Sequence, residues 1–230
     1  MRTKLHLWSA TFVALALTAA AARGQTYNET GDAGQTLGTV QATGASSGNP
    51  LSTISGNISG INDADLYLFT ITAPTTFSAT TFGGSTLDTA LFLFTNGGVP
   101  ISTNDDASGM TLQSTLPAGS SFTVSLSAGT YILGISLSGN EPMNLNGQLL
   151  FAPYPGGDST AVRGPAAGLN PNTLSGFNSA AGFGEMGAYS IFLSSSATAA
   201  VPEPSTTALV LLVLAGRFAS KRWISSRNEA

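Results

Sequence analysis

The segment Leu87-Asp88-Thr89-Ala90-Leu91-Phe92-Leu93-Phe94 gives the clearest indication of how this chain folds. Successive side chains of a β-strand point to opposite faces of a sheet, so Phe92 and Phe94 share one face while Leu91 and Leu93 share the other. Apolar side chains on both faces are typical of a strand that is covered on both sides. We therefore interpret the two phenylalanines as core residues and not as an exposed binding stripe.

Similar runs, rich in Thr, Ile, Phe, Tyr and Val, recur on both sides of this segment and are separated by Gly, Asn, Asp, Pro and Ser. They predict strands at residues 51–58, 65–72, 75–82, 87–94, 99–103, 121–126, 130–137, 147–151 and 188–194. Many short strands with glycine-rich turns, and no competing helical pattern, favour an all-β fold. We expect an antiparallel β-sandwich with jelly-roll-like connections, and a barrel is the alternative.

The predicted sandwich domain covers residues 51–194. Within it, residues 152–186 form a long loop excursion, and Tyr154, Phe177 and Phe183 indicate that this excursion folds back onto the sheets. Residues 25–50 are rich in Gly, Thr, Ser and Gln with few large apolar side chains, which predicts a loose N-terminal arm. Residues 195–200 are small and predict a linker.

Residues 1–24 have the pattern of a Sec-type signal peptide. Arg2 and Lys4 precede an apolar core at residues 7–17, and small residues follow, with cleavage plausible after Ala22 or Gly24. The chain is therefore expected to use the Sec translocon and signal peptidase and to be exported through the inner membrane.

The C-terminal segment, residues 201–230, has three parts. Val201-Pro202-Glu203-Pro204-Ser205 comes first, and its prolines predict a stiff, exposed, non-helical spacer. The apolar run at 206–216 predicts a short hydrophobic helix that suits lipid. The basic residues Arg217, Lys221 and Arg222 follow, which places this end on the cytoplasmic side and the bulk of the chain outside.

This order of parts resembles the C-terminal sorting signal of PEP-CTERM proteins. The resemblance implies that an exosortase, an integral-membrane cysteine protease, reads and cleaves the segment. The chain would be anchored in the membrane by its C-terminal helix before processing, and would then lie at the cell surface or outside the cell. A plain single-span anchor is the alternative.

The charge of the exported part excludes some functions. Between residues 25 and 200 the chain has one basic residue, Arg163, and ten acidic ones, so its net charge is −9. Such a surface repels phosphate backbones, which argues against nucleic-acid binding. The chain has no cysteine, and residues 25–200 contain no histidine or lysine, so the usual nucleophiles and general bases are missing. We predict that the protein is not an enzyme; a hydrolase that uses paired carboxylates is a distant alternative.

Acidic and amide side chains concentrate at predicted strand ends. Half of the ten acids fall within residues 63–106 with no base among them. Oxygen ligands that converge on loops are what Ca²⁺ prefers, although Asp and Asn also form turns for purely local reasons. The candidate calcium ligands are Asp63, Asp65, Asp88, Asn104, Asp105 and Asp106. No other cofactor is indicated.

The segments Asp63-Ala64-Asp65-Leu66-Tyr67-Leu68-Phe69-Thr70-Ile71, Leu87 to Phe94, Asn104-Asp105-Asp106 and Ala128-Gly129-Thr130-Tyr131-Ile132-Leu133 together resemble the bacterial pre-peptidase C-terminal domain. The resemblance implies a β-sandwich of a secreted protein, and some members of that family bind calcium or extracellular polymers. Two functions follow as hypotheses. The first is a non-catalytic surface or extracellular-matrix protein sorted by an exosortase. The second is a calcium-dependent carbohydrate- or polymer-binding module.

Overall fold

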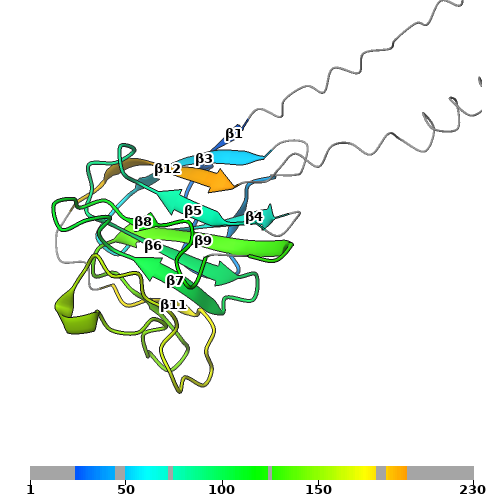
Figure 1. Cartoon of the computed structure of the whole chain (residues 1–230). Helices are drawn as coiled ribbons and strands as arrows, with labels where there is room; N and C mark the ends of the chain where they lie inside the picture. The colour runs from blue at the N-terminus through cyan, green and yellow to red at the C-terminus, as the bar shows by residue number, and fades with distance from the viewer. Residues whose placement is uncertain (1–23, 45–49, 72–74, 124–125, 180–184, 196–230) are drawn as a thin grey trace, which may run out of the picture.

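The computed structural model describes residues 24–44, 50–71, 75–123, 126–179 and 185–195, and these residues form an all-β fold (Figure 1). Sheet I has the strand order β1 (Gln25–Asn28), β3 (Leu51–Ile58), β12 (Gly187–Ser195), β5 (Phe77–Thr80) and β8 (Thr115–Leu116). Sheet II has the order β2 (Gln41–Ala42), β4 (Ala64–Ile71), β9 (Gly129–Leu137), β6 (Thr89–Thr95) and β7 (Pro100–Asn104). A small ribbon pairs β10 (Pro142–Met143) with β11 (Gly176–Phe177), and Pro155–Gly157 forms a single 3₁₀ turn.

The two sheets pack face to face as a β-sandwich. Strands of sheet I contribute Ile54, Tyr189 and Ile191 to the core between them, and strands of sheet II contribute Tyr67 and Leu133. All five side chains are buried. Burial of apolar surface is the main favourable term in folding, so this inter-sheet core is the principal source of stability.

A third layer covers the outer face of sheet II. We call residues 142–179 the loop layer, and Figure 1 shows it against sheet II on the side away from sheet I. Phe92 and Phe94 of β6 are buried there against Phe151 and Phe177, with ring centroids 5.8 Å apart for both Phe92 contacts. Leu91 belongs instead to the inter-sheet core. The prediction that β6 is covered on both faces is confirmed. The described part of the predicted excursion folds back onto sheet II through Phe177, whereas Phe183 lies outside the described residues.

Arg163 fixes the loop layer to sheet II through its backbone and to the segment after β9 through a buried ion pair. The Arg163 guanidinium lies 2.7 Å from the Glu141 carboxylate, donates to the Ala152 carbonyl at 3.0 Å and stacks 3.7 Å above the centre of the Tyr154 ring. The backbone of Arg163 also exchanges two hydrogen bonds of 2.9 Å with Thr103 at the end of β7. The single basic residue of residues 25–200 is therefore used inside the fold.

Five predicted strands agree with β3, β4, β6, β9 and β12, and the strands predicted at 75–82 and 99–103 overlap β5 and β7. Two predicted strands differ from the structure. Of the strand predicted at 121–126, residues 121–123 form a turn, in which Thr123 donates to the Pro117 carbonyl, and Leu126 forms an isolated bridge with Thr75, while residues 124–125 lie outside the described residues. Residues 147–151 contribute only isolated bridges at Leu149 and Phe151, because Asn144 closes a turn by accepting from the backbone N–H of Gln148.

Residues 25–50 were expected to form a loose N-terminal arm. Their described part instead contains β1 and β2. Both strands pair in parallel, β1 with β3 and β2 with β4, so the sheets are mixed and not purely antiparallel. The Gln41 side chain links the two strands by accepting from the Tyr27 hydroxyl at 2.8 Å and from the Thr30 N–H at 3.1 Å. Jelly-roll connectivity stays a prediction.

The predicted signal peptide (apart from Gly24), most of the predicted linker and the whole C-terminal segment lie outside the described residues. Among the described residues, no helix is long and apolar enough to cross a membrane.

Candidate metal centre

The six predicted calcium ligands lie at one end of sheet II, but the structure does not bring them to one point. Asp63 and Asp65 stand where β4 begins, Asp88 directly precedes β6, and Asn104 to Asp106 stand where β7 ends. Adjacent strands are about 4.8 Å apart, and β9 and β6 lie between β4 and β7. The candidates therefore divide into a group near β4 and a group near β6 and β7.

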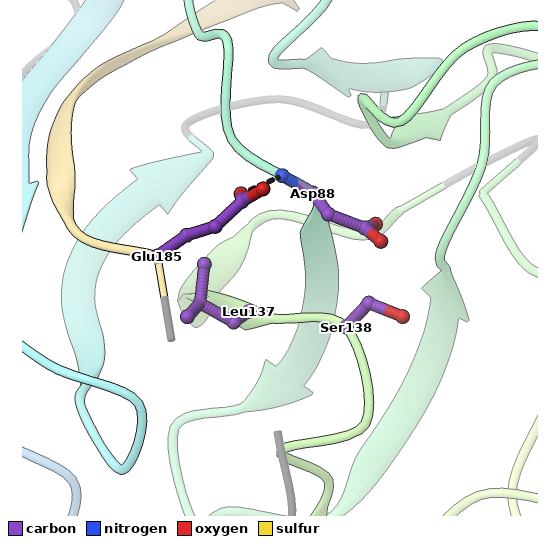
Figure 2. Close-up of a pocket in the computed structure, with 4 residues that line it drawn as sticks. All are labelled: Asp88, Leu137, Ser138 and Glu185. Atoms are coloured by element: carbon purple, nitrogen blue, oxygen red, sulfur yellow. Dashed lines mark hydrogen bonds between the residues drawn. The ribbon is translucent and has the colours of Figure 1, made fainter. Parts of the chain in front are cut away.

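Of the group near β6 and β7, Asp88 lines a shallow depression, together with Leu137, Ser138 and Glu185 (Figure 2). The Glu185 carboxylate accepts a 3.0 Å hydrogen bond from the backbone N–H of Asp88. The Asp88 side chain points to the same side as the Ser138 hydroxyl, which donates to Asp105 at 3.0 Å.

The electrostatics of this depression disfavour ionised carboxylates. Burial raises the pKa of Asp88 to about 6, and the charges of Asp105, Asp106 and Glu185 act in the same direction. Burial also raises the pKa of Asp105, whereas its hydrogen bonds from Tyr154 and Ser138 oppose that shift. The group is acidic and without a cationic side chain.

Three of the predicted ligands hold loops in place. The Asn104 side chain accepts from the backbone N–H of Thr115 at 2.8 Å and donates to the Thr160 carbonyl at 3.1 Å. The Asp106 carboxylate accepts from the Ser159 hydroxyl at 2.5 Å. The Asp63 carboxylate accepts from the backbone N–H of Ser59 at 2.5 Å. These contacts are the local turn and loop chemistry that was the alternative to metal binding.

A different set of carboxylates converges. Glu29, Asp32 and Asp65 each place an oxygen within 4.8 Å of the others, and no other such group of three occurs among the described residues. Glu29 and Asp32 follow β1 of sheet I, whereas Asp65 lies in β4 of sheet II. The three carboxylates therefore meet where the segment after β1 lies next to β4 of sheet II.

Asp65 is the unusual member because it is 0% exposed. Its Oδ2 accepts from the Tyr189 hydroxyl at 2.7 Å, and the Tyr189 and Tyr67 hydroxyls hydrogen-bond at 2.5 Å. Its Oδ1 is buried and has no hydrogen-bond partner. Burial raises the pKa of Asp65 to about 8, and the charges of Asp63, Glu29 and Asp32 add to that shift. A buried oxygen without a partner is costly unless a proton or a cation supplies the missing contact.

Backbone donors orient the other two carboxylates. Glu29 accepts from the N–H groups of Ala33 at 2.9 Å and Asn57 at 2.8 Å, and Asp32 accepts from the N–H of Gly34 at 3.0 Å. The one basic residue of residues 25–200, Arg163, is paired with Glu141 elsewhere. Three hard oxygen donors without a cationic side chain fit Ca²⁺, whose remaining ligands are often water or carbonyl oxygens.

Sequence reasoning found Asp65 but missed Glu29 and Asp32, because it set their segment aside as a loose arm. The spacing Glu29-Thr30-Gly31-Asp32 directly after a Thr- and Tyr-containing strand is the signal that could have identified them.

No protein-family model matches this chain, and a search of curated proteins finds no significant match either.

Proposed function

We propose that this chain is a non-catalytic protein that is exported and then sorted by an exosortase to the cell surface or extracellular matrix. The observation that carries the proposal is the order of the C-terminal parts: Pro202-Glu203-Pro204, then an apolar run, then Arg217, Lys221 and Arg222. This order resembles a PEP-CTERM signal. An N-terminal segment with the pattern of a signal peptide supports the same route.

The proposed route begins at the Sec translocon and signal peptidase. The C-terminal helix then holds the chain in the membrane until the exosortase cleaves near the Pro-Glu-Pro segment. The folded domain ends up outside the inner membrane, where it contributes to the polymer matrix of the envelope.

The chemistry of the described residues supports a non-catalytic role. Three hydroxyl groups gather in one place, where Thr89 lies 2.7 Å from Thr81 and 3.0 Å from Ser114. All three side chains are 0% exposed, so a substrate cannot reach them. The carboxylates lie beside no histidine or lysine, because residues 25–200 contain neither.

The sorting proposal is tested by expressing the full chain in a host that has an exosortase. Mass spectrometry of the recovered protein should show that the unmodified chain has lost its C-terminal tail. The variant Pro202→Ala/Glu203→Ala/Pro204→Ala should keep the tail and stay in the membrane fraction. Identical cleavage of both proteins would refute the proposal.

The second candidate function is a calcium-dependent, polymer-binding module, as the resemblance to pre-peptidase C-terminal domains suggests. The specific observation in its favour is the buried, unpartnered Oδ1 of Asp65 beside Glu29 and Asp32. Calcium at 100 times its Kd should stabilise the fold by about 2.7 kcal/mol.

Thermal unfolding of the full chain in Ca²⁺ and in EDTA measures this effect, which should amount to several degrees in a chain of this size. The shift should vanish in Asp65→Asn and persist in the control Asp158→Asn, whose carboxylate is exposed and outside both acidic groups. A shift that survives Asp65→Asn would exclude this site.

A further inference from the structure

The outer face of sheet I has an unusual composition. Strand alternation and the register of the pairs place twelve side chains on this face, none of them buried. They comprise eight hydroxyl residues, two asparagines, one alanine and one phenylalanine. The set is Thr26, Asn28, Thr53, Ser55, Asn57, Ser78, Thr80, Thr115, Ala188, Ser190, Phe192 and Ser194.

No member of this hydroxyl face is charged, although residues 25–200 carry a net charge of −9. The acidic residues of the domain are therefore all placed elsewhere. A face of this size without charge fits a partner that is itself uncharged.

The hydroxyl groups on this face are held in rows across the strands. Ser55 of β3 and Ser190 of β12 hydrogen-bond at 2.9 Å, and Thr80 of β5 and Thr115 of β8 at 2.6 Å. Each hydroxyl has one donor and two acceptor lone pairs, so the Ser55–Ser190 pair keeps one donor and several acceptor positions for an outside ligand. The Thr80 hydroxyl also donates to the Ser114 carbonyl at 3.2 Å and accepts from the Phe82 N–H at 3.1 Å, so its pair keeps acceptor positions on Thr115. Their orientation is fixed before any ligand arrives, which lowers the entropy lost on binding.

An exposed aromatic ring lies within these rows. Phe192 is 42% exposed and pairs across the sheet with Thr53 on one side and Thr80 on the other. Its ring lies against Gly84, where a Cβ would be only 3.0 Å from the ring and 2.2 Å from the Ser190 carbonyl oxygen. A glycine at position 84 therefore allows the ring to lie over the backbone at this point.

We propose that the hydroxyl face binds a neutral polysaccharide. The C–H face of a sugar can pack on the Phe192 ring, while its hydroxyl groups exchange hydrogen bonds with the serine and threonine rows. The negative charge of the domain repels acidic polymers, and the face has no cation with which to hold one. This inference deepens the proposed matrix function and rests on it, because the partner is met only outside the cell.

The test is co-sedimentation of the full chain, purified in mild detergent, with insoluble cellulose, β-1,3-glucan and mannan. Cross-linked, insoluble carboxymethyl cellulose is the anionic counterpart with the same backbone as cellulose. We expect binding to at least one neutral polymer and weaker binding to the anionic one. Phe192→Ala should lower the association constant about tenfold, and Thr53→Ala should lower it less. Leu145→Ala, which removes a side chain 78% exposed in the loop layer, is the matched control and should have no effect.

Three outcomes would overturn the inference. The first is an absence of binding to all three neutral polymers. The second is binding that Phe192→Ala leaves intact. The third is a dimer in light scattering that Phe192→Ala disperses, which would assign the face to a second copy of this chain. The assay uses unprocessed protein, so its result is independent of whether an exosortase cleaves the chain.

Discussion

The two outer faces of the sandwich differ in how the chain covers them. The outer face of sheet II is lined by Leu66, Phe92, Phe94 and Ile132, and the loop layer buries it. The outer face of sheet I carries serine and threonine and is left to solvent. One face is closed by the protein itself, and the other is available to a partner. The difference is encoded in the strands, because β6 is apolar on both faces while β12 alternates.

The largest expected effect is the difference in stability loss between substitutions of Phe92 and Phe192, which face outward from sheet II and sheet I. Phe92→Ala should lower the free energy of unfolding by about 3 to 5 kcal/mol, because it leaves a cavity beneath the loop layer. Phe192→Ala should change it by only about 0.5 kcal/mol, because its ring is partly in solvent. Denaturant unfolding of both variants measures the difference, and equal losses would contradict the contrast between the faces.

The next effect concerns the ion pair that holds the loop layer. Arg163→Met should destabilise the fold by about 3 kcal/mol, because it leaves the Glu141 carboxylate buried and unpaired. The double variant Arg163→Met/Glu141→Leu should recover part of that loss. A loss below about 0.5 kcal/mol in the single variant would mean that the loop layer does not depend on this pair.

The smallest expected effect is a pH dependence of stability caused by Asp88. This residue directly precedes β6, at the end of the sandwich where Glu185 precedes β12. Asp105, Asp106 and Glu185 surround Asp88, whose pKa is raised to about 6. A carboxyl with a raised pKa stabilises the fold fully below about pH 4, and this stabilisation is lost as the pH rises through about 6.

Asp88→Asn should therefore remove part of the decline in stability between pH 4 and pH 6. Above pH 7, the melting temperatures of the variant and of the unmodified chain should change with pH in the same way. Thermal unfolding at several pH values measures this. Parallel stability profiles over the whole range would show that Asp88 does not titrate in this window.

The long strands of the fold could be predicted because their side chains carry their own pattern. The alternation in residues 51–58 and the double-sided apolar run at Leu91 to Phe94 identify β3 and β6 without tertiary information. The strands β1 and β2 could not be found in this way. They are short, and they form because the edges of β3 and β4 offer backbone partners.

The candidate metal centre was predictable only in part, for the same reason. Asp65 is recognisable as an acid at a strand end, but its partners Glu29 and Asp32 reach it only because β1 pairs with β3. Asp88 and Asp105 were predicted to belong with Asp65, whereas β9 and β6 separate β4 from β7 and keep these groups apart. Strand order, which one sequence does not reveal, decides which carboxylates meet.

The claim that the open face of sheet I is the working surface is tested most directly by mapping where a ligand contacts the protein. Backbone amide chemical shifts of the isotopically labelled full chain in mild detergent, recorded with a soluble oligosaccharide of whichever neutral polymer it binds, provide this map. We expect the changes to be concentrated in β3, β5 and β12. Changes concentrated in the loop layer, or spread evenly over both sheets, would contradict it.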